Sequence, residues 1–164
     1  MNNAQLINQD SGNFEYYTPM EIVEAARLVM GSIDLDPASS AKANERIKAL
    51  KYYSEGALEK PWFGNIWMNH PFSRINNPLF VGKLVEWYES MSGRQACCIT
   101  FAATSGKWFQ PLLNYPQCFL SPRTNYYMPD GKKKRGVTKG SVVTYLGGNT
   151  EKFKEVFGRF GVVK

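Results

Sequence analysis

The sequence has few cysteines and almost no histidine. Among its 164 residues there are three cysteines, Cys97, Cys98 and Cys118, and a single histidine, His70. An odd number of cysteines without a repeated spacing does not indicate a disulfide framework. Because Cys97 and Cys98 lie within an apolar run, we expect buried free thiols and a reducing compartment. We expect no metal site.

Long apolar runs, internal repeats and linkers are also missing. No apolar run reaches the roughly 18 residues that a membrane-spanning helix needs, and no signal peptide can be recognised. We therefore expect a cytoplasmic protein that does not bind membranes. The chain is long enough for one domain with a substantial core. We expect a single domain over residues 1–164, flexible at the polar residues 1–13, without a separate target-recognition domain.

Acidic residues are fewer than basic ones, 14 against 20, which gives a formal net charge of +6. A basic protein of this kind favours a polyanionic partner. Hydrophobic residues make up 43% of the chain and aromatic residues 14%. This composition excludes a chain that is disordered over most of its length.

Most of the excess positive charge comes from one segment, residues 122–140. Six basic residues stand there against Asp130, a balance of +5. The basic residues are Arg123, Lys132, Lys133, Lys134, Arg135 and Lys139. Tyr126 and Tyr127 belong to the same segment, and basic groups beside aromatic rings suit contact with a nucleic acid. The alternative is an ordinary solvated surface.

Hydrophobic periodicity predicts helices that alternate with strands. Helices are predicted over residues 18–31, 40–50, 77–91 and 150–157, with a short one at 108–113. Strands are predicted at residues 32–36, 52–53, 64–69, 95–101, 117–120 and 141–147. This alternation indicates an α/β fold, and the sheet should be mostly parallel. Because the last strands lack helices between them, we expect an antiparallel edge.

Two helix starts have recognisable capping signals. Thr18 is expected to cap the first helix, with Pro19 at the first helical position and Glu21 completing a capping box. Asn77 is expected to cap the helix at 77–91, with Pro78 following it. In the helix at 40–50, Leu50 falls on the apolar stripe.

Two of the predicted strands end in polar residues. One ends at Asp36-Pro37, and the other ends at Asn69 and continues as His70-Pro71-Phe72. An amide, a rigid bend and an exposed ring are typical of the lip of an active site. In an open α/β sheet, ligands bind at the carboxyl ends of the strands. If the two strands are neighbours, a carboxylate and an amide face one crevice.

The chemistry of this crevice suits an amine. The carboxylate of Asp36 fits an amino-bearing cofactor, and the carbonyl oxygen of Asn69 can accept a hydrogen bond from an exocyclic amine. Phe72 offers a face on which a nucleobase could stack. Two simpler readings remain open. Asp36 could cap a helix, and His70 could be either a general base or a passive residue.

Several segments together resemble a known family. They read EYYTPMEIVEAARLVMG, IDLDPASS, WFGNIWMNHPFS and KGSVVTYLGG, and they occur in this order along nearly the whole chain, which ends in a final helix. The sequence resembles the small DNA N6-adenine methyltransferases of phages and prophages, the Dam-like family. The resemblance implies a compact Rossmann-like class I fold that uses S-adenosylmethionine, in a bacterial host cell.

The resemblance also implies roles for individual residues. Asn69 and the carbonyl of His70 would accept hydrogen bonds from the target amine, while Pro71 stiffens the bend and Phe72 stacks on a flipped base. The cofactor would be held by Tyr17, Thr18, Pro19, Asp34, Asp36, Pro37, Ala38, Glu55 and Asn69. Arg74 would join the basic segment in contacting DNA, double- or single-stranded, with low or short sequence specificity.

One position departs from the family pattern. His70 stands where the family usually has proline. A histidine still supplies the backbone carbonyl, so the change need not abolish activity. Two alternatives stay open: a catalytically impaired nucleic-acid-binding protein with a methyltransferase fold, and an amino-methyltransferase that acts on RNA or nucleotides.

Overall fold

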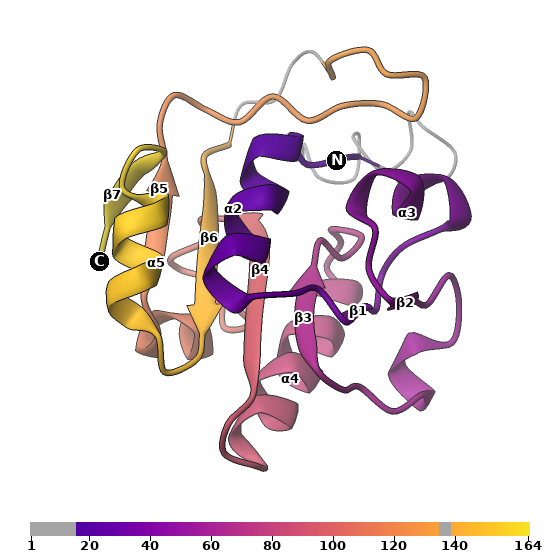
Figure 1. Cartoon of the computed structure of the whole chain (residues 1–164), viewed down its shortest axis with the longest axis horizontal. Helices are drawn as coiled ribbons and strands as arrows, with labels where there is room; N and C mark the ends of the chain where they lie inside the picture. Colours follow the sequence, from indigo (N-terminus) through magenta and orange to yellow (C-terminus); the bar gives the residue numbers. More distant parts are fainter. Residues whose placement is uncertain (1–15, 135–138) are drawn as a thin grey trace.

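The computed structural model describes residues 16–134 and 139–164 (Figure 1). The expectation for residues 1–13 lies outside these ranges. The helices are α2 (Met20–Met30), α3 (Ala41–Ile47), α4 (Asn76–Glu89) and α5 (Thr150–Phe157), with short 3-10 helices η1 (Ala57–Glu59) and η2 (Gln110–Asn114). The strands are β1 (Leu35–Asp36), β2 (Lys51–Tyr52), β3 (Asn65–Met68), β4 (Gln95–Phe101), β5 (Gln117–Leu120), β6 (Ser141–Leu146) and β7 (Gly161–Val163).

All seven strands form one sheet in the order β2-β1-β3-β4-β6-β5-β7. Strands β2, β1, β3 and β4 pair in parallel, and the pairs β4–β6, β6–β5 and β5–β7 are antiparallel. The α/β architecture and its antiparallel edge are thus confirmed. Strand β2, which follows β1 in the chain, pairs on one side of β1, and the next strand, β3, pairs on its other side. This reversal creates a topological switch point between β1 and β3, where open α/β sheets bind ligands.

The sheet has an apolar core on each face because its central strands are buried on both sides. One core contains side chains of α2 and α5 together with Trp67 and Cys97, and the other contains side chains of α4 with Met68 and Cys98. Successive strand residues point to opposite faces, which explains why neighbouring residues join different cores. Figure 1 shows α4 behind the sheet and α2 and α5 in front of it. The three cysteines are free and buried, as expected.

The first helix begins later than its capping signal predicts. Helix α2 starts at Met20 with Pro19 as its N-cap, and no side chain caps it. The expected capping box at Thr18 is therefore wrong. The hydroxyl oxygen of Thr18 instead accepts a hydrogen bond from Asn69. The end of the helix follows the prediction, because Gly31 has a φ of 92° and takes the left-handed conformation that a helix stop favours.

Helix α3 is shorter than the periodicity predicts. Its N-cap is Ser40, whose hydroxyl accepts from the backbone of Ala43 at 3.0 Å. It ends at Ile47 because Lys48 is left-handed, with a φ of 55°. Leu50 consequently leaves the helical stripe and is 82% exposed, so its expected core position is wrong. The early stop lets the chain turn into β2.

Helix α4 begins at Asn76 with Ile75 as N-cap, so Asn77 is not the cap that the sequence predicts. Instead, the hydroxyl of Ser73 accepts a hydrogen bond from the backbone of Asn76 at 2.9 Å. The side chain of Asn77 is thereby left to contact another residue, His70.

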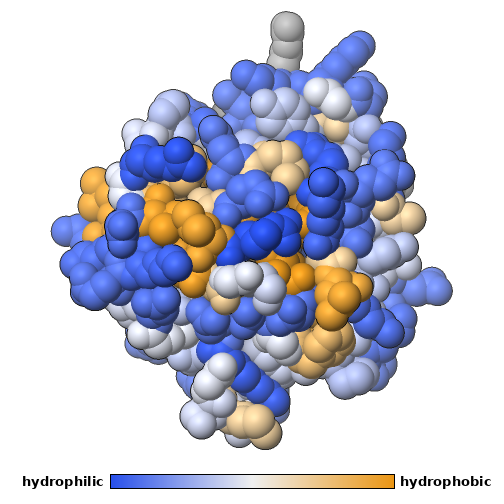
Figure 2. Space-filling model, viewed as in Figure 1, coloured by the Kyte–Doolittle hydropathy of each residue, from blue (hydrophilic) through white to orange (hydrophobic). Residues whose placement is uncertain are grey.

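Residues 121–134, which follow β5, cross the top of the molecule in Figure 1. They reach the beginning of α2, because Tyr127 and Tyr17 exchange two backbone hydrogen bonds of 2.8 and 2.7 Å. Figure 2 shows that this face is mostly hydrophilic, with its apolar groups separated from one another by polar ones. Within the described residues, none of the helices has the length and apolar character needed to span a membrane.

Candidate active site

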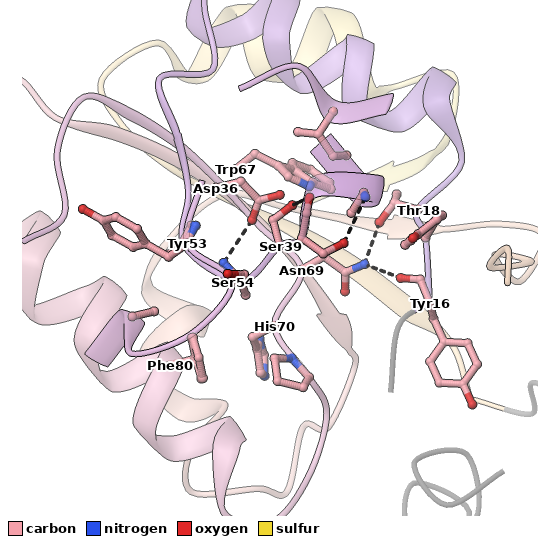
Figure 3. A pocket seen from close by; sticks show the side chains of 18 of the residues that line it. Tyr16, Thr18, Asp36, Ser39, Tyr53, Ser54, Trp67, Asn69, His70 and Phe80 are labelled. Atoms are coloured by element: carbon pink, nitrogen blue, oxygen red, sulfur yellow. Dashed lines mark hydrogen bonds between the residues drawn. The ribbon is translucent and has the colours of Figure 1, made fainter. Parts of the chain in front are cut away.

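A cavity of about 230 Å³ lies at the carboxyl ends of β1 and β3, at the switch point of the sheet. We call it the Asp36–Asn69 pocket, because these two residues end β1 and follow β3 and both line it. Figure 3 shows Asp36 and Asn69 near the middle of the pocket, Tyr16 and Thr18 at one end, and Tyr53 and Phe80 at the other. The expected crevice between a carboxylate and an amide is thus present.

Asp36 is a buried carboxyl group whose side chain is 3% exposed. Its Oδ1 accepts a hydrogen bond from the backbone of Ala38 at 3.1 Å. Burial nevertheless raises the pKa of Asp36 to about 7, because desolvation outweighs this bond and the hydrogen bond with the Ser39 side chain. Within the described chain, no Lys or Arg forms an ion pair with it. No helix starts at Asp36 either, so its reading as a helix cap is wrong.

Asn69 has its amide oriented by two acceptors. Its Nδ2 donates to the carbonyl oxygen of Tyr16 at 2.9 Å and to Oγ1 of Thr18 at 3.1 Å. Both N–H groups are thereby used, so the amide is fixed with its Oδ1 as the atom available to a ligand. Thr18 is 2% exposed and thus acts as a rigid support.

His70 is buried and held in one orientation. Its ring is 1% exposed and its Nε2 lies 2.8 Å from Oδ1 of Asn77. Among the described residues, Nδ1 has no hydrogen-bond partner. Burial lowers the pKa of His70 to about 4, so the ring is neutral at pH 7 and a weak base. This disfavours the reading of His70 as a general base.

The His70 ring is surrounded by aromatic rings. It stacks on Phe80 at 5.8 Å between ring centroids, and it meets Phe72 edge-on at 5.1 Å and Trp108 at 6.5 Å. Phe72 is itself only 8% exposed and packs against Phe101 at 4.6 Å. The expectation of an exposed ring at this lip is therefore wrong. Phe72 still borders the pocket and remains a candidate for stacking.

The structure brings most of the predicted cofactor residues to the pocket. Its lining includes Tyr17, Thr18, Asp36, Pro37, Ala38, Glu55, Asn69, His70, Pro71 and Phe72. Asp34 does not line it. Its carboxylate accepts from the backbone of Asn65 at 2.7 Å and from Ser32 at 3.0 Å, where β3 begins. Pro19 is also absent from the lining, because it caps α2. The structure therefore places both residues outside the pocket lining, and their roles toward the cofactor stay predictions.

Sequence reasoning missed Arg46, which also lines the pocket. Its guanidinium lies 5.2 Å from the ring centre of Tyr17 and 5.5 Å from that of Tyr127. In the part of the chain that the structure describes, it forms no ion pair with a carboxylate. No sequence signal marks this arginine, because its place depends on the direction of α3 and on the segment that carries Tyr127.

A second cavity, of about 640 Å³, adjoins the pocket and shares Phe72 with it. Its lining includes three cationic residues, Arg74, Lys107 and Lys139, and the ring of Trp108. The described lining contains no acidic residue. The neighbouring Phe109 is fully buried in the core. The cavity therefore combines positive charge with aromatic surface.

The basic segment divides between several environments. Arg123, Lys132, Lys133 and Lys139 are exposed, and Lys134 lies 5.8 Å from the ring centre of Tyr16. Arg135 lies outside the described residues. Tyr126 is 3% exposed, and its hydroxyl bonds to Ser141 at 2.8 Å. The ring of Tyr126 therefore belongs to the core, and its contact with nucleic acid stays a prediction.

Residues 8–147 match a sequence model of the family described as DNA N-6-adenine-methyltransferase (Dam). The chain belongs to the Dam family. The match contains every lining residue of the two cavities, whereas α5 and β7 lie beyond it. The resemblance inferred from the sequence is thus confirmed. A search of curated proteins gave no match.

Proposed function

We propose that this Dam family protein transfers a methyl group from S-adenosylmethionine to the N6 amine of adenine in DNA. One observation carries the proposal. The buried carboxyl group of Asp36 and the oriented amide of Asn69 face the same pocket at the switch point of the sheet. A carboxyl group without a cationic partner in the described chain and a fixed carbonyl acceptor are the groups that an amino-bearing cofactor and an aromatic amine require.

The residues of the pocket fit S-adenosylmethionine. Asp36 lacks a cationic partner among the described residues and suits the ammonium group of the methionine part. Arg46 lacks a carboxylate partner in the described chain and suits the carboxylate of the same part. Tyr53 and Phe80 supply apolar rings for the nucleoside part. Glu55, exposed at the rim, can accept from ribose hydroxyls.

Catalysis by this chain consists mainly of positioning and exclusion of water. When bound, S-adenosylmethionine would supply an electrophilic methyl group on a sulfonium, with the neutral thioether as leaving group, and the methylated amine would lose its proton to water. Oδ1 of Asn69 and the carbonyl of His70 accept from the two N–H groups of the amine. These bonds hold the nitrogen lone pair in the direction of attack.

DNA would bind across the second cavity, which borders the pocket at Phe72. Arg74, Lys107 and Lys139 would contact phosphates. A flipped adenine would reach Asn69 past the rings of Phe72 and Trp108. The described residues form one sheet with its flanking helices, so base recognition would be limited to a short sequence.

We assign the sheet to the Rossmann-like class I arrangement. Support comes from the parallel strands on both sides of the switch point and from β6, which runs antiparallel between β4 and β5. A phage- or prophage-encoded protein of this kind would act in the cytoplasm of the bacterial host, where both DNA and cofactor are present.

The test is methyl transfer from S-adenosylmethionine with a labelled methyl group. Duplex DNA, single-stranded DNA, RNA and free nucleotides are offered as acceptors, and label in DNA is the expected result. Asn69→Ala should reduce transfer by about 100-fold or more, because it removes an interaction with the reacting amine. Labelling of RNA or nucleotides alone would replace the proposed acceptor. Binding to DNA without transfer to any acceptor would indicate an impaired, DNA-binding member of the family.

A further inference from the structure

His70 has one ring nitrogen that is satisfied and one that is not. Nε2 faces Oδ1 of Asn77 at 2.8 Å. An amide oxygen can only accept, so Nε2 carries the proton and Nδ1 holds a lone pair. Nδ1 is buried and has no partner in the described chain. Buried polar atoms are nearly always paired, and His70 is a lining residue of the pocket, so its unpaired Nδ1 points to a partner on the ligand.

The ring cannot easily turn to find another partner. It is 1% exposed, stacks on Phe80 with an interplanar angle of 15°, and is packed edge-on by Phe72 at 90° and by Trp108 at 77°. Rotation would also break the bond to Asn77. The acceptor is therefore held in a fixed direction, which is what positioning of a ligand requires.

The place of His70 in the pocket indicates which part of a ligand it meets. His70 lines the Asp36–Asn69 pocket together with Phe80 and Tyr53. Figure 3 places Phe80 beside His70, whereas Tyr16 and Thr18 lie at the opposite end. The end of the pocket beside His70 offers flat apolar rings and a neutral acceptor. These groups match a nucleoside, which has aromatic faces and O–H and N–H donors.

We propose that Asn77 holds His70 as the Nε2–H tautomer, and that Nδ1 of His70 accepts a hydrogen bond from a donor on the nucleoside part of S-adenosylmethionine. The proposal rests on the function proposed above. It makes the Asn77–His70 pair a positioning device for the cofactor. A proline at position 70 would supply the backbone carbonyl but no acceptor on its side chain, so this chain gains a contact that proline cannot make.

The direct test uses nitrogen-15 NMR of the histidine ring. His70 is the only histidine in the sequence. Protein without a histidine tag therefore gives two histidine ring-nitrogen signals. We expect a protonated Nε2 and an unprotonated Nδ1, and we expect the Nδ1 signal to move upfield when S-adenosylhomocysteine is added. Methylthioadenosine, which has the nucleoside but no amino acid part, should cause the same shift. Methionine should cause none.

The outcomes separate the two proposals. If calorimetry shows that S-adenosylhomocysteine binds while the Nδ1 signal stays in place, the positioning role of His70 is wrong and the proposed function stands. A protonated Nδ1 in the free protein would overturn the tautomer and with it the proposal. If none of the nucleoside ligands binds, both the cofactor assignment and the role of His70 fall.

A pair of variants tests the role of Asn77. Asn77→Asp places a carboxylate against the ring and raises the pKa of His70, and a protonated Nδ1 cannot accept. We expect affinity for S-adenosylhomocysteine, relative to the parent, to fall at least fivefold at about pH 6 and to recover at about pH 8.5. Asn76→Asp makes the same charge change one residue earlier. Its affinity for S-adenosylhomocysteine, divided by that of the parent, should be the same at both pH values.

Other titrating groups do not mimic this result. The charged residues that line the two cavities are Asp36, Arg46, Glu55, Arg74, Lys107 and Lys139. They are present in the parent and in both variants, so their effect on binding cancels in the ratio. Equal profiles for Asn77→Asp and Asn76→Asp would show that the Asn77–His70 contact is only structural.

Discussion

At the scale of single residues, the site depends on polar groups that the folded chain buries without satisfying them fully. Asp36 shows this most clearly, because burial raises its pKa to about 7 although Ala38 donates to it. The sequence suffices to find Asp36 and Asn69, since each follows an apolar strand and belongs to a recognisable motif. Arg46 and Asn77 could not be found in this way, because their partners lie in other elements.

Replacing Asp36 should reveal its burial as a pH-dependent change in stability. Because the pKa of Asp36 is higher in the folded than in the unfolded protein, its neutral form favours the folded state at low pH. This contribution to the free energy of unfolding is lost as the pH rises from about 4 to 7. Asp36→Asn avoids this loss. Relative to the parent, the variant should gain up to about 4 kcal/mol in free energy of unfolding between pH 4 and 8.

Denaturant unfolding of the parent and of Asp36→Asn at both pH values measures this gain. The same variant should bind S-adenosylhomocysteine much more weakly at pH 8, because the partner of the ammonium group is gone. A stability difference that does not change with pH would contradict the raised pKa.

Arg46 should distinguish ligands by their carboxylate. Arg46→Gln is expected to weaken binding of S-adenosylhomocysteine by about 10-fold or more, since hydrogen bonds to charged groups contribute about 1.5–3 kcal/mol. Binding of methylthioadenosine, which lacks a carboxylate, should be unchanged. Calorimetry measures both, with Lys42→Gln on the exposed side of α3 as control. An equal loss for the two ligands would mean that Arg46 only shapes the pocket through Tyr17 and Tyr127.

At the scale of elements, short segments set the geometry of the site. Strand β1 has two residues and α3 has seven, and both are shorter than the periodicity predicts. Hydrophobic periodicity does not predict the left-handed conformation of Lys48, which ends α3. The capping signals predict Thr18 and Asn77 as N-caps, but both side chains bond to residues outside their helices. A capping signal in the sequence is the same whether the side chain bonds to its own helix or to a distant residue.

The turn before β3 should be sensitive to a single methyl group. Gly64 has a φ of 68°, and a Cβ there would lie 2.5 Å from Cβ of Asp34. Gly64→Ala should therefore cost about 1–3 kcal/mol in free energy of unfolding. Gly82 in α4 has open space around it, so Gly82→Ala should instead stabilise by about 0.5–1 kcal/mol. Equal effects in denaturant unfolding would contradict the close approach to Asp34.

The rim of the second cavity should govern the salt dependence of DNA binding. Arg74→Ala with Lys107→Ala is expected to weaken binding and to reduce the slope of log affinity against log salt by about 0.9 for each DNA phosphate that the variant no longer neutralises. The matched control is Lys152→Ala with Lys154→Ala, which removes two exposed charges from α5. Fluorescence anisotropy at several salt concentrations measures the slope. Identical slopes for the two double variants would place the DNA elsewhere.

At the scale of the whole molecule, the sequence predicts the fold class but not the arrangement that makes the site. Alternating helices and strands indicate an α/β sheet with an antiparallel edge, and the structure has both. The strand order could not be derived, because local patterns do not say on which side of β1 the next strands pair. That order brings Asp36 and Asn69 to one pocket and turns two polar strand ends into a site.

The function proposed for this pocket is methylation of the N6 amine of adenine in DNA. The most direct measurement is nucleoside analysis, by mass spectrometry, of unmethylated DNA incubated with the purified protein and S-adenosylmethionine. We predict N6-methyladenine in the DNA treated with the parent protein, and almost none with a folded Asn69→Ala variant. Methylcytosine in place of N6-methyladenine, or equal methylation by the Asn69→Ala variant, would contradict the claim.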